Sequence, residues 1–223
     1  MAKLGTTYSG IGMTSQRTRS RMVDRLREKG IRNDRVLTAM SEIPRHIFIE
    51  PALESRAYDD VSLPLGHGQT ISQPYIVARM TELLLSAPKS PNKILEIGTG
   101  CGYQTAVLAH IFGEVYSVER IAALQERARQ TIKTLGLNTR VRLSHHDGHH
   151  GLIEAAPFDG IIVTAAAAEI PKALIEQLGP QGRLIIPVGQ EQQHLWSVDK
   201  LENDIQSAQL DTVRFVPLLS GRS

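Results

Sequence analysis

The stretch from Lys93 to Thr105, KILEIGTGCGYQT, constrains the fold of this chain more than any other segment. It opens with a short, mainly apolar run, Ile94 to Ile97, which is typical of a strand buried in a parallel sheet. Glycines at positions 98, 100 and 102 then let the backbone turn sharply and approach a ligand without a Cβ in the way. Residues 103–111 predict a helix with one apolar face. Strand, glycine loop and helix together indicate the opening unit of a nucleotide-binding α/β fold.

The spacing of these glycines argues against a dinucleotide ligand. A G-x-G-x-x-G/A fingerprint would need glycine or alanine where this chain has Tyr103. Acidic residues lie on both sides of the first helix instead: Glu96 precedes the loop, and Glu119 ends a second apolar strand, Val115 to Val118. Two acidic strand ends suit a ligand with hydroxyl groups and a positive charge better than one with a pyrophosphate.

This arrangement resembles the glycine loop of class I S-adenosyl-L-methionine (SAM) methyltransferases. The resemblance implies that Glu119 binds the ribose hydroxyls and that the glycine backbone faces the amino-acid end of SAM. The cofactor contacts expected in this part of the chain are Glu96, Gly98, Thr99, Gly100, Gly102, Glu119 and Arg120. The alternative is a doubly wound domain without a cofactor, in which the glycines only permit tight packing of helix on strand.

Length and composition describe an ordinary globular protein. A chain of 223 residues can bury a full core as one domain, and a net charge of +2 is too small to indicate nucleic-acid or membrane partners. One cysteine excludes an internal disulfide and fits a reducing compartment. No apolar run reaches 18 residues, and the N-terminus lacks an apolar signal segment. We therefore expect a cytoplasmic protein, and we expect it to be a monomer.

The N-terminal region predicts short helices. Residues 1–15 show no apolar periodicity and are expected to be disordered, which leaves residues 16–223 as a single domain. A basic helix is expected from Ser15 to Gly30, followed by a second short helix capped by Asn33 or Asp34. Acidic residues interrupt the basic face, so a solvated helix surface explains it better than a phosphate-binding site.

Residues 58–80 combine an irregular loop with a helix start. Gly66 and Gly68 indicate the loop, Ser72 suits a helix N-cap, and Pro74 suits the first turn of the helix that follows. By residue type alone, Ser72 is therefore explained as a cap without any further function.

The same segment carries the most specific resemblance in the chain. YDD at 58–60, LP at 63–64, GQTISQP at 68–74 and ILEIGTG at 94–100 are similar to the motifs of protein-L-isoaspartate (D-aspartate) O-methyltransferases. The match runs from about Met22 to Leu218. It implies transfer of a methyl group from SAM, leaving S-adenosyl-L-homocysteine, to the carboxyl group of L-isoaspartyl and D-aspartyl residues in damaged proteins and peptides.

The resemblance also implies roles for individual residues. Ser72 corresponds to the active-site serine, and residues about 16–90 to a helical and loop cap over the substrate. The residues placed beside the cofactor are Gln69, Thr70, Ile71 and Ser72. The ending VRFVPL matches as well, which places substrate contacts at Val216, Pro217 and Leu218.

A third strand, beginning at Val141–Leu143, leads into the histidine-rich loop SHHDGHHG. Four histidines in six residues could bind a metal, but no acidic or cysteine ligand pattern accompanies them elsewhere, so we expect no functional metal site. This loop lies where the third strand of a SAM methyltransferase ends, so the resemblance implies that Asp147 accepts a hydrogen bond from the adenine amino group, with Gly148 beside it.

The fourth strand, Phe158–Thr164, brings Thr164 to the cofactor and runs into four alanines. These side chains are small enough to let a peptide pass, so Ala165 and Ala166 are expected to contact the substrate.

The remaining elements complete the fold class. We expect a helix over Ile170–Leu178 ended by Gly179-Pro180, a strand over Arg183–Val188, and a hairpin of His194–Val198 with Leu210–Leu219. The expected fold is α/β, with a doubly wound, mostly parallel Rossmann-like sheet, a C-terminal antiparallel hairpin and short N-terminal helices.

The expected chemistry needs no enzyme nucleophile or general base. A free aspartyl carboxyl has a pKa of about 3.9, so the acceptor is already ionised at neutral pH. Ser72 would orient it by a hydrogen bond. Cys101 stands where the family commonly has serine; it is interpreted as a small loop residue that could make the protein sensitive to thiol reagents.

Three alternatives remain from the sequence. A SAM methyltransferase acting on a small molecule or on RNA would keep the glycine loop, although the run from Gln69 to Pro74 argues against it. An NAD-dependent dehydrogenase would need glycine or alanine where this chain has Tyr103. A non-catalytic module would bind SAM and transfer nothing.

Overall fold

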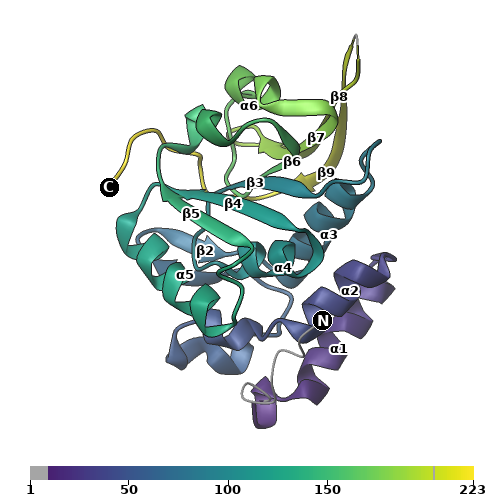
Figure 1. Ribbon diagram of the computed structural model, residues 1–223. Coiled ribbons are helices and arrows are strands. Elements are labelled where there is room, and N and C mark those ends of the chain that lie inside the picture. The colour runs from purple at the N-terminus through teal and green to yellow at the C-terminus, as the bar shows by residue number, and fades with distance from the viewer. Residues whose placement is uncertain (1–9, 203) are drawn as a thin grey trace.

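The computed structural model describes residues 10–202 and 204–223, which form a central sheet with helices on both faces (Figure 1). Within them, seven strands lie in the order β5-β4-β3-β6-β7-β8-β9, and β1 and β2 form a separate two-stranded sheet. Strands β3 to β7 pair in parallel, whereas β8 and β9 add an antiparallel hairpin. The strands are β1 (Leu63–Gly66), β2 (Gln69–Ile71), β3 (Lys93–Ile97), β4 (Glu114–Glu119), β5 (Val141–His145), β6 (Phe158–Val163), β7 (Leu178–Val188), β8 (Gln193–Lys200) and β9 (Ile205–Val213). The predicted fold class is confirmed.

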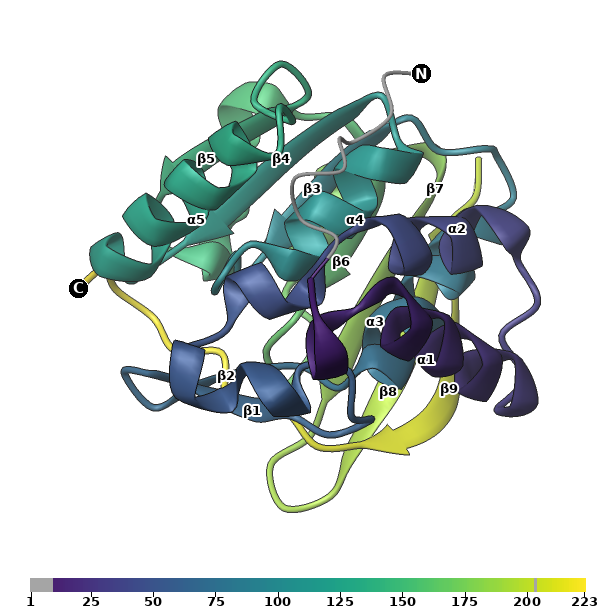
Figure 2. The ribbon, with the colours of Figure 1, turned by 90° about the horizontal axis from the view of Figure 1, so that it is seen from below.

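Helices cover the two faces of the sheet unequally. Figure 2 shows α3, α4 and α5 over one face, where α1 and α2 pack against α3 and α4, while α6 lies over the other face in Figure 1. The α-helices are α1 (Gln16–Glu28), α2 (Asp34–Glu42), α3 (Pro74–Leu85), α4 (Tyr103–Ile111), α5 (Ala122–Thr134) and α6 (Lys172–Glu176). The 3₁₀ helices are η2 (Gly12–Thr14), η3 (Arg45–Phe48), η4 (Pro51–Arg56), η5 (Gly148–His150) and η6 (Ile153–Ala155). None of the described helices has the length and apolar character that a membrane span requires.

The register of three central strands positions the site. Ile97, the last residue of β3, pairs with Val118 of β4 on one side and with Val163 of β6 on the other. Because the strands are parallel, the residues that follow these three emerge at the same edge of the sheet. The predicted strand, glycine loop and helix at residues 93–111 are thereby confirmed, as is the strand that ends at Glu119.

The two N-terminal helices lie where the sequence predicts them, and the predicted cap of the second one is Asn33. The Ser15 hydroxyl accepts from the backbone N–H of Thr18 at the start of α1, and the Asn33 side chain accepts from the first turn of α2. The expectation of disorder at residues 1–15 falls mostly on residues 1–9, which lie outside the described residues. A 3₁₀ turn over Gly12–Thr14 precedes α1.

Two local predictions were wrong because strand pairing overrides local signals. The loop around Gly66 and Gly68 is a hairpin, in which β1 pairs with β2. The helix expected over residues 170–178 spans only Lys172–Glu176, since Leu178 already pairs with Phe158 as the start of β7. Gly179 and Pro180 fall in the gap where that pairing shifts register, a place where a sheet tolerates proline.

The second strand of the predicted hairpin lies earlier than expected. It spans Ile205–Val213 rather than Leu210–Leu219, and the chain after it leaves β8 for another partner. The backbone N–H of Ala166 donates to the carbonyl of Val216 at 2.8 Å, and the N–H of Leu218 donates back to Ala166 at 2.7 Å. The C-terminal segment therefore crosses the carboxyl edge of the sheet.

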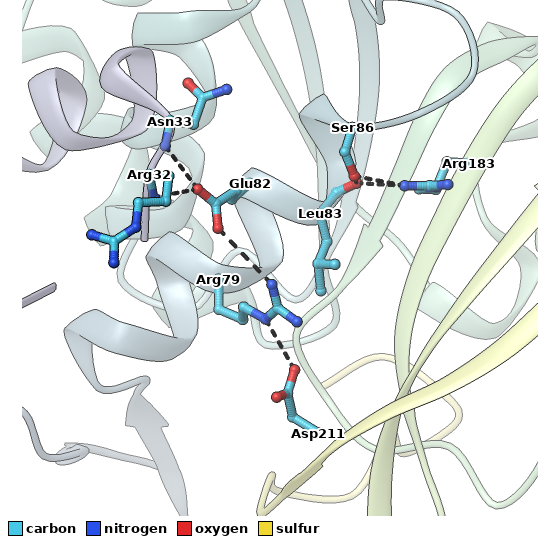
Figure 3. Close-up of polar contacts among 8 residues, drawn as sticks. All are labelled: Arg32, Asn33, Arg79, Glu82, Leu83, Ser86, Arg183 and Asp211. Carbon is cyan, nitrogen blue, oxygen red and sulfur yellow. Dashed lines mark hydrogen bonds and ion pairs between the residues drawn. The ribbon is translucent and has the colours of Figure 1, made fainter. Parts of the chain in front are cut away.

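Polar contacts hold α3 to the segments on either side of it (Figure 3). The Glu82 carboxylate accepts from the backbone N–H groups of Arg32 and Asn33 at 2.7 and 2.8 Å. Arg79 donates to Asp211 of β9 at 3.0 Å. At the helix end, Arg183 of β7 donates to the carbonyl of Leu83 at 3.0 Å.

We predict that Glu82→Ala lowers the free energy of unfolding by about 1.5–3 kcal/mol, because it removes a charged acceptor from two backbone N–H groups. Urea unfolding measures the change. The matched control is Glu126→Ala: both glutamates lie in helices and pair with an arginine three residues away, but Glu126 has a side chain that is 61% exposed against 17% for Glu82. The control should cost no more than about 0.5 kcal/mol, and equal losses in the two variants would contradict the prediction.

Candidate active site

A cavity of about 600 Å³, partly open to solvent, lies at the carboxyl ends of β3, β4 and β6. Its size is within the range of small-molecule sites, and its place at the carboxyl edge of a parallel sheet is where α/β folds bind ligands. It brings together most of the residues predicted from the sequence: Gln69, Thr70, Gly98, Gly100, Glu119, Arg120, Gly148, Thr164, Ala165, Val216, Pro217 and Leu218.

The glycine loop is built for close backbone packing. Gly98 has a φ of +96°, and a Cβ there would lie 2.4 Å from Oγ1 of Thr164. That hydroxyl instead donates to the Gly98 carbonyl at 2.7 Å, and the Gly98 N–H donates to Val118 at 2.8 Å. The loop is thus fixed to the strands on both sides of β3, with its backbone lining the cavity.

Glu119 connects the end of β4 to this loop. One of its carboxylate oxygens accepts from the N–H of Gly100 at 2.8 Å, and the other accepts from the N–H of Ile121 at 2.9 Å. The residue is 6% exposed and lines the cavity. Since each carboxylate oxygen can accept a second bond, the oriented carboxylate can still receive hydroxyl donors from a ligand.

Glu96 lies beneath the loop and does not line the cavity. Its Oε2 accepts hydrogen bonds from the hydroxyls of Thr105 and Ser117, each at 2.5 Å, and its Oε1 has no partner among the described residues. Ser117 also lies 2.6 Å from the Thr99 hydroxyl, which belongs to the glycine loop. Complete burial raises the pKa of Glu96 to about 8, although the two hydroxyl hydrogen bonds oppose the shift. This position favours support of the loop over contact with a ligand.

Ser72 lines a second groove that adjoins the cavity. The groove shares Thr70, Thr164 and Val216 with the cavity, so the two spaces meet at these residues. The prediction that Ser72 caps α3 was wrong. The cap position belongs to Gln73, which makes no side-chain cap bond, and Asp60 accepts from the N–H of Tyr75 at 2.8 Å. The first turn of α3 is thus capped by Asp60, which lies 15 positions before Tyr75 in the sequence. The hydroxyl of Ser72 has no hydrogen-bond partner within the described chain.

Arg45, which sequence reasoning missed, holds the Ser72 segment in place. Its guanidinium donates to the carbonyls of Ala57 and Ser72, both at 2.7 Å, and lies 4.8 Å from the ring centroid of Tyr103. The side chain is fully buried, and desolvation lowers its pKa. A charged residue within the apolar run from Ile43 to Ile49 was the available signal.

Asp147 lies next to the cavity-lining Gly148, and its carboxylate binds backbone N–H groups. Its carboxylate accepts from the N–H of Gly221 at 2.6 Å and from the N–H of His149 at 2.9 Å. Partial burial acts to raise the pKa of Asp147, but these hydrogen bonds outweigh it and lower the pKa. Gly148 lines the cavity, whereas Asp147 does not. The predicted site residues outside the cavity lining are Ile71, Ser72, Glu96, Thr99, Gly102, Asp147 and Ala166.

The structure also shows the surroundings of the cysteine and of the histidine-rich loop. Cys101 is buried, which raises the pKa of its thiol to about 11, and both features argue against the expected sensitivity to thiol reagents. Around the histidine-rich loop, as elsewhere in residues 10–202 and 204–223, no three potential ligands come together as a metal site would require.

Comparisons with known proteins agree along nearly the whole chain. The family model described as Protein-L-isoaspartate(D-aspartate) O-methyltransferase (PCMT) matches residues 17–223. A protein-L-isoaspartate O-methyltransferase of Chromobacterium violaceum is 56% identical over 99% of both chains, and one of Dechloromonas aromatica is 58% identical over 95% of this chain and 98% of its own. A Plasmodium falciparum structure, described as such an enzyme in complex with S-adenosyl-L-homocysteine, has a TM-score of 0.80 and 26% identity over 90% of this chain and 98% of its own.

We predict that Glu96→Gln removes a pH dependence of stability. In the folded protein Glu96 keeps its proton up to a pH of about 8. In the unfolded chain, with the ordinary glutamate pKa of 4.5, it loses the proton at lower pH. The folded state therefore binds more protons across this window, and the free energy of unfolding of the wild type falls as pH rises from about 4.5 to about 8. Glutamine keeps the acceptor for both hydroxyls but does not ionise. Urea unfolding at pH 5 and pH 8 should show a smaller decline for Glu96→Gln than for the wild type or the exposed control Glu126→Gln. Parallel declines in all three would contradict the assignment.

Proposed function

This chain belongs to the protein-L-isoaspartate (D-aspartate) O-methyltransferase family, and on that premise we propose how its residues perform the reaction of the family. The protein is a repair methyltransferase that transfers a methyl group from SAM to the carboxyl group of isoaspartyl residues in damaged proteins. The observation that carries the proposal is the junction at Thr70, Thr164 and Val216, where the cavity on the glycine loop meets the groove of Ser72. A donor in one space and an acceptor in the other would meet there.

The residues of the cavity fit SAM. Apolar side chains of Ile97, Val118 and Ile121 can pack against an adenine ring, and the Glu119 carboxylate can accept from the ribose hydroxyls. When bound, SAM supplies a methyl group on a positively charged sulfur, which leaves with the bonding electron pair as S-adenosyl-L-homocysteine.

The groove has to supply orientation and not proton transfer. The acceptor carboxylate is ionised at neutral pH, so one of its oxygens can attack without a general base. A carboxylate is a poor nucleophile while it is hydrated, so the groove must displace water and align the oxygen with the methyl group. We assign this alignment to the Ser72 hydroxyl, which is free to donate, on a backbone that Arg45 holds in place.

We also propose that the N-terminal part of the chain covers the substrate and that the enzyme is a monomer. Gln69, Thr70 and Ser72 come from the first 90 residues, which supports a role for residues 16–90 as a cap over the substrate. A single chain supplies both cavity and groove, which supports a monomer. The net charge of +2 offers little attraction for nucleic acid or a membrane surface, which supports proteins as its partners. The single cysteine fits a reducing compartment, which supports a cytoplasmic enzyme.

The test is methyl transfer from labelled SAM to an isoaspartyl peptide, measured beside the same peptide with normal aspartate. Only the isoaspartyl peptide should become labelled. In this assay Ser72→Ala should lower kcat by about 10- to 1,000-fold, while SAM affinity changes by no more than a few-fold. The control is Ser207→Ala, an exposed serine of β9. An unchanged kcat in Ser72→Ala would remove the orienting role, and an unlabelled isoaspartyl peptide would remove the function.

We predict that Glu119→Ala weakens SAM binding by about 1.5–3 kcal/mol, the value of hydrogen bonds to a charged group. The change removes the acceptor for the ribose and frees the N–H of Gly100, which loosens the loop. Calorimetry with SAM measures it, with Glu114→Ala at the other end of β4 as the control. Equal affinities of Glu119→Ala and the wild type would contradict the role.

A further inference from the structure

The groove of Ser72 has two walls of different origin. One wall is the start of α3, with Ser72, Gln73 and Ile76, and the other is the segment of residues 212–216 after β9. Among the described residues that line this groove, Arg214 alone carries a full charge. The groove is therefore electropositive, although most of its surface is neutral.

No acidic side chain neutralises Arg214. The nearest one along the chain, Asp211, receives its hydrogen bond from Arg79 of α3 at 3.0 Å (Figure 3). Arg214 itself is exposed and has no hydrogen-bond or ion-pair partner within the described residues. The Arg79–Asp211 contact thus leaves the guanidinium of Arg214 available to a ligand.

The backbone around Arg214 is held firmly. The Phe215 N–H donates to the Gln193 side chain at 2.6 Å, and the same side chain donates back to the Phe215 carbonyl at 3.1 Å. One residue further, the Val216 carbonyl accepts from Ala166. These bonds fix the attachment point of the arginine at the edge of the groove, so its charge acts from a defined place.

We propose that Arg214 is a specificity-determining residue that attracts the anionic acceptor into the groove and does not retain the neutral ester. The inference rests on the proposed function. The acceptor carries a negative charge before transfer and none on the methylated carboxyl afterwards. A cation at the groove therefore attracts the substrate and leaves the binding of the neutral ester unaffected, so it favours capture of substrate over retention of product.

The exposure of Arg214 suits this task better than a buried position would. The carboxylate loses its charge as the methyl group is transferred, so a tight ion pair would stabilise the ground state more than the transition state and slow the reaction. An exposed guanidinium interacts weakly through solvent and is screened by salt. Its effect should appear in KM and not in kcat.

The experiment compares Arg214→Ala, Arg214→Lys and the wild type with an isoaspartyl peptide at low and high salt. A second ligand is the same peptide with a carboxamide in place of the acceptor carboxyl, used as a competitive inhibitor of similar shape and no charge. The control is Arg21→Ala, which makes the same change in net charge at an exposed arginine of α1 outside both spaces.

Arg214→Ala should raise KM about 3- to 5-fold at low salt, the size expected of an exposed charge pair, and the difference should shrink at about 1 M salt. Its kcat, its affinity for S-adenosyl-L-homocysteine and its inhibition by the carboxamide peptide should stay within about two-fold of the wild type. Arg214→Lys should keep most of the low KM, and Arg21→Ala should match the wild type.

An unchanged KM in Arg214→Ala would overturn the inference. Equal weakening of the carboxylate and carboxamide peptides would overturn it as well, because it would show a loss of groove shape and not of charge. Neither result would affect the proposed function, which fails only if the wild-type protein leaves the isoaspartyl peptide unlabelled.

Discussion

The whole site depends on the register of β3, β4 and β6, whose carboxyl ends are aligned at one edge of the sheet. Ile97 pairs with Val118 and Val163, so the next residues in each strand, Gly98, Glu119 and Thr164, emerge side by side. Gly98 belongs to the glycine loop, and Glu119 and Thr164 both form hydrogen bonds with it. A shift of one residue in either pairing would turn alternate side chains to the other face and separate the carboxylate from the loop.

Two buried ionisable residues support the loops from behind. Glu96 receives hydroxyls from β4 and α4, and Arg45 donates to carbonyls that include that of Ser72. Each keeps one polar atom without a partner among the described residues, which costs free energy in a buried site. Such a cost is tolerated where both groups fix the backbone of segments that line the cavity and the groove.

The acceptor side is assembled from parts of the chain that lie far apart in sequence. Ser72 stands at the start of α3, Thr164 follows β6, and residues 212–216 follow β9. The contact between Arg79 and Asp211 spans 132 positions and joins the two walls near the groove. The electrostatic character of the groove therefore depends on which charges pair across it, and not on the composition of any one segment.

By itself, the sequence determined the elements whose signals are local. Apolar runs, the glycine spacing and the acidic strand ends predicted β3, α4 and β4 together with Gly98 and Glu119, because strand and helix periodicity depends on near neighbours. The motif around Ser72 predicted the family. The tertiary structure alone decided that Ser72 is no helix cap, that Glu96 lies beneath the loop, and that the carboxylate of Asp147 binds Gly221. The bonds of Asp60, Ser117 and Gly221 that produce these outcomes join residues 15 to 74 positions apart, and no local pattern encodes such pairing.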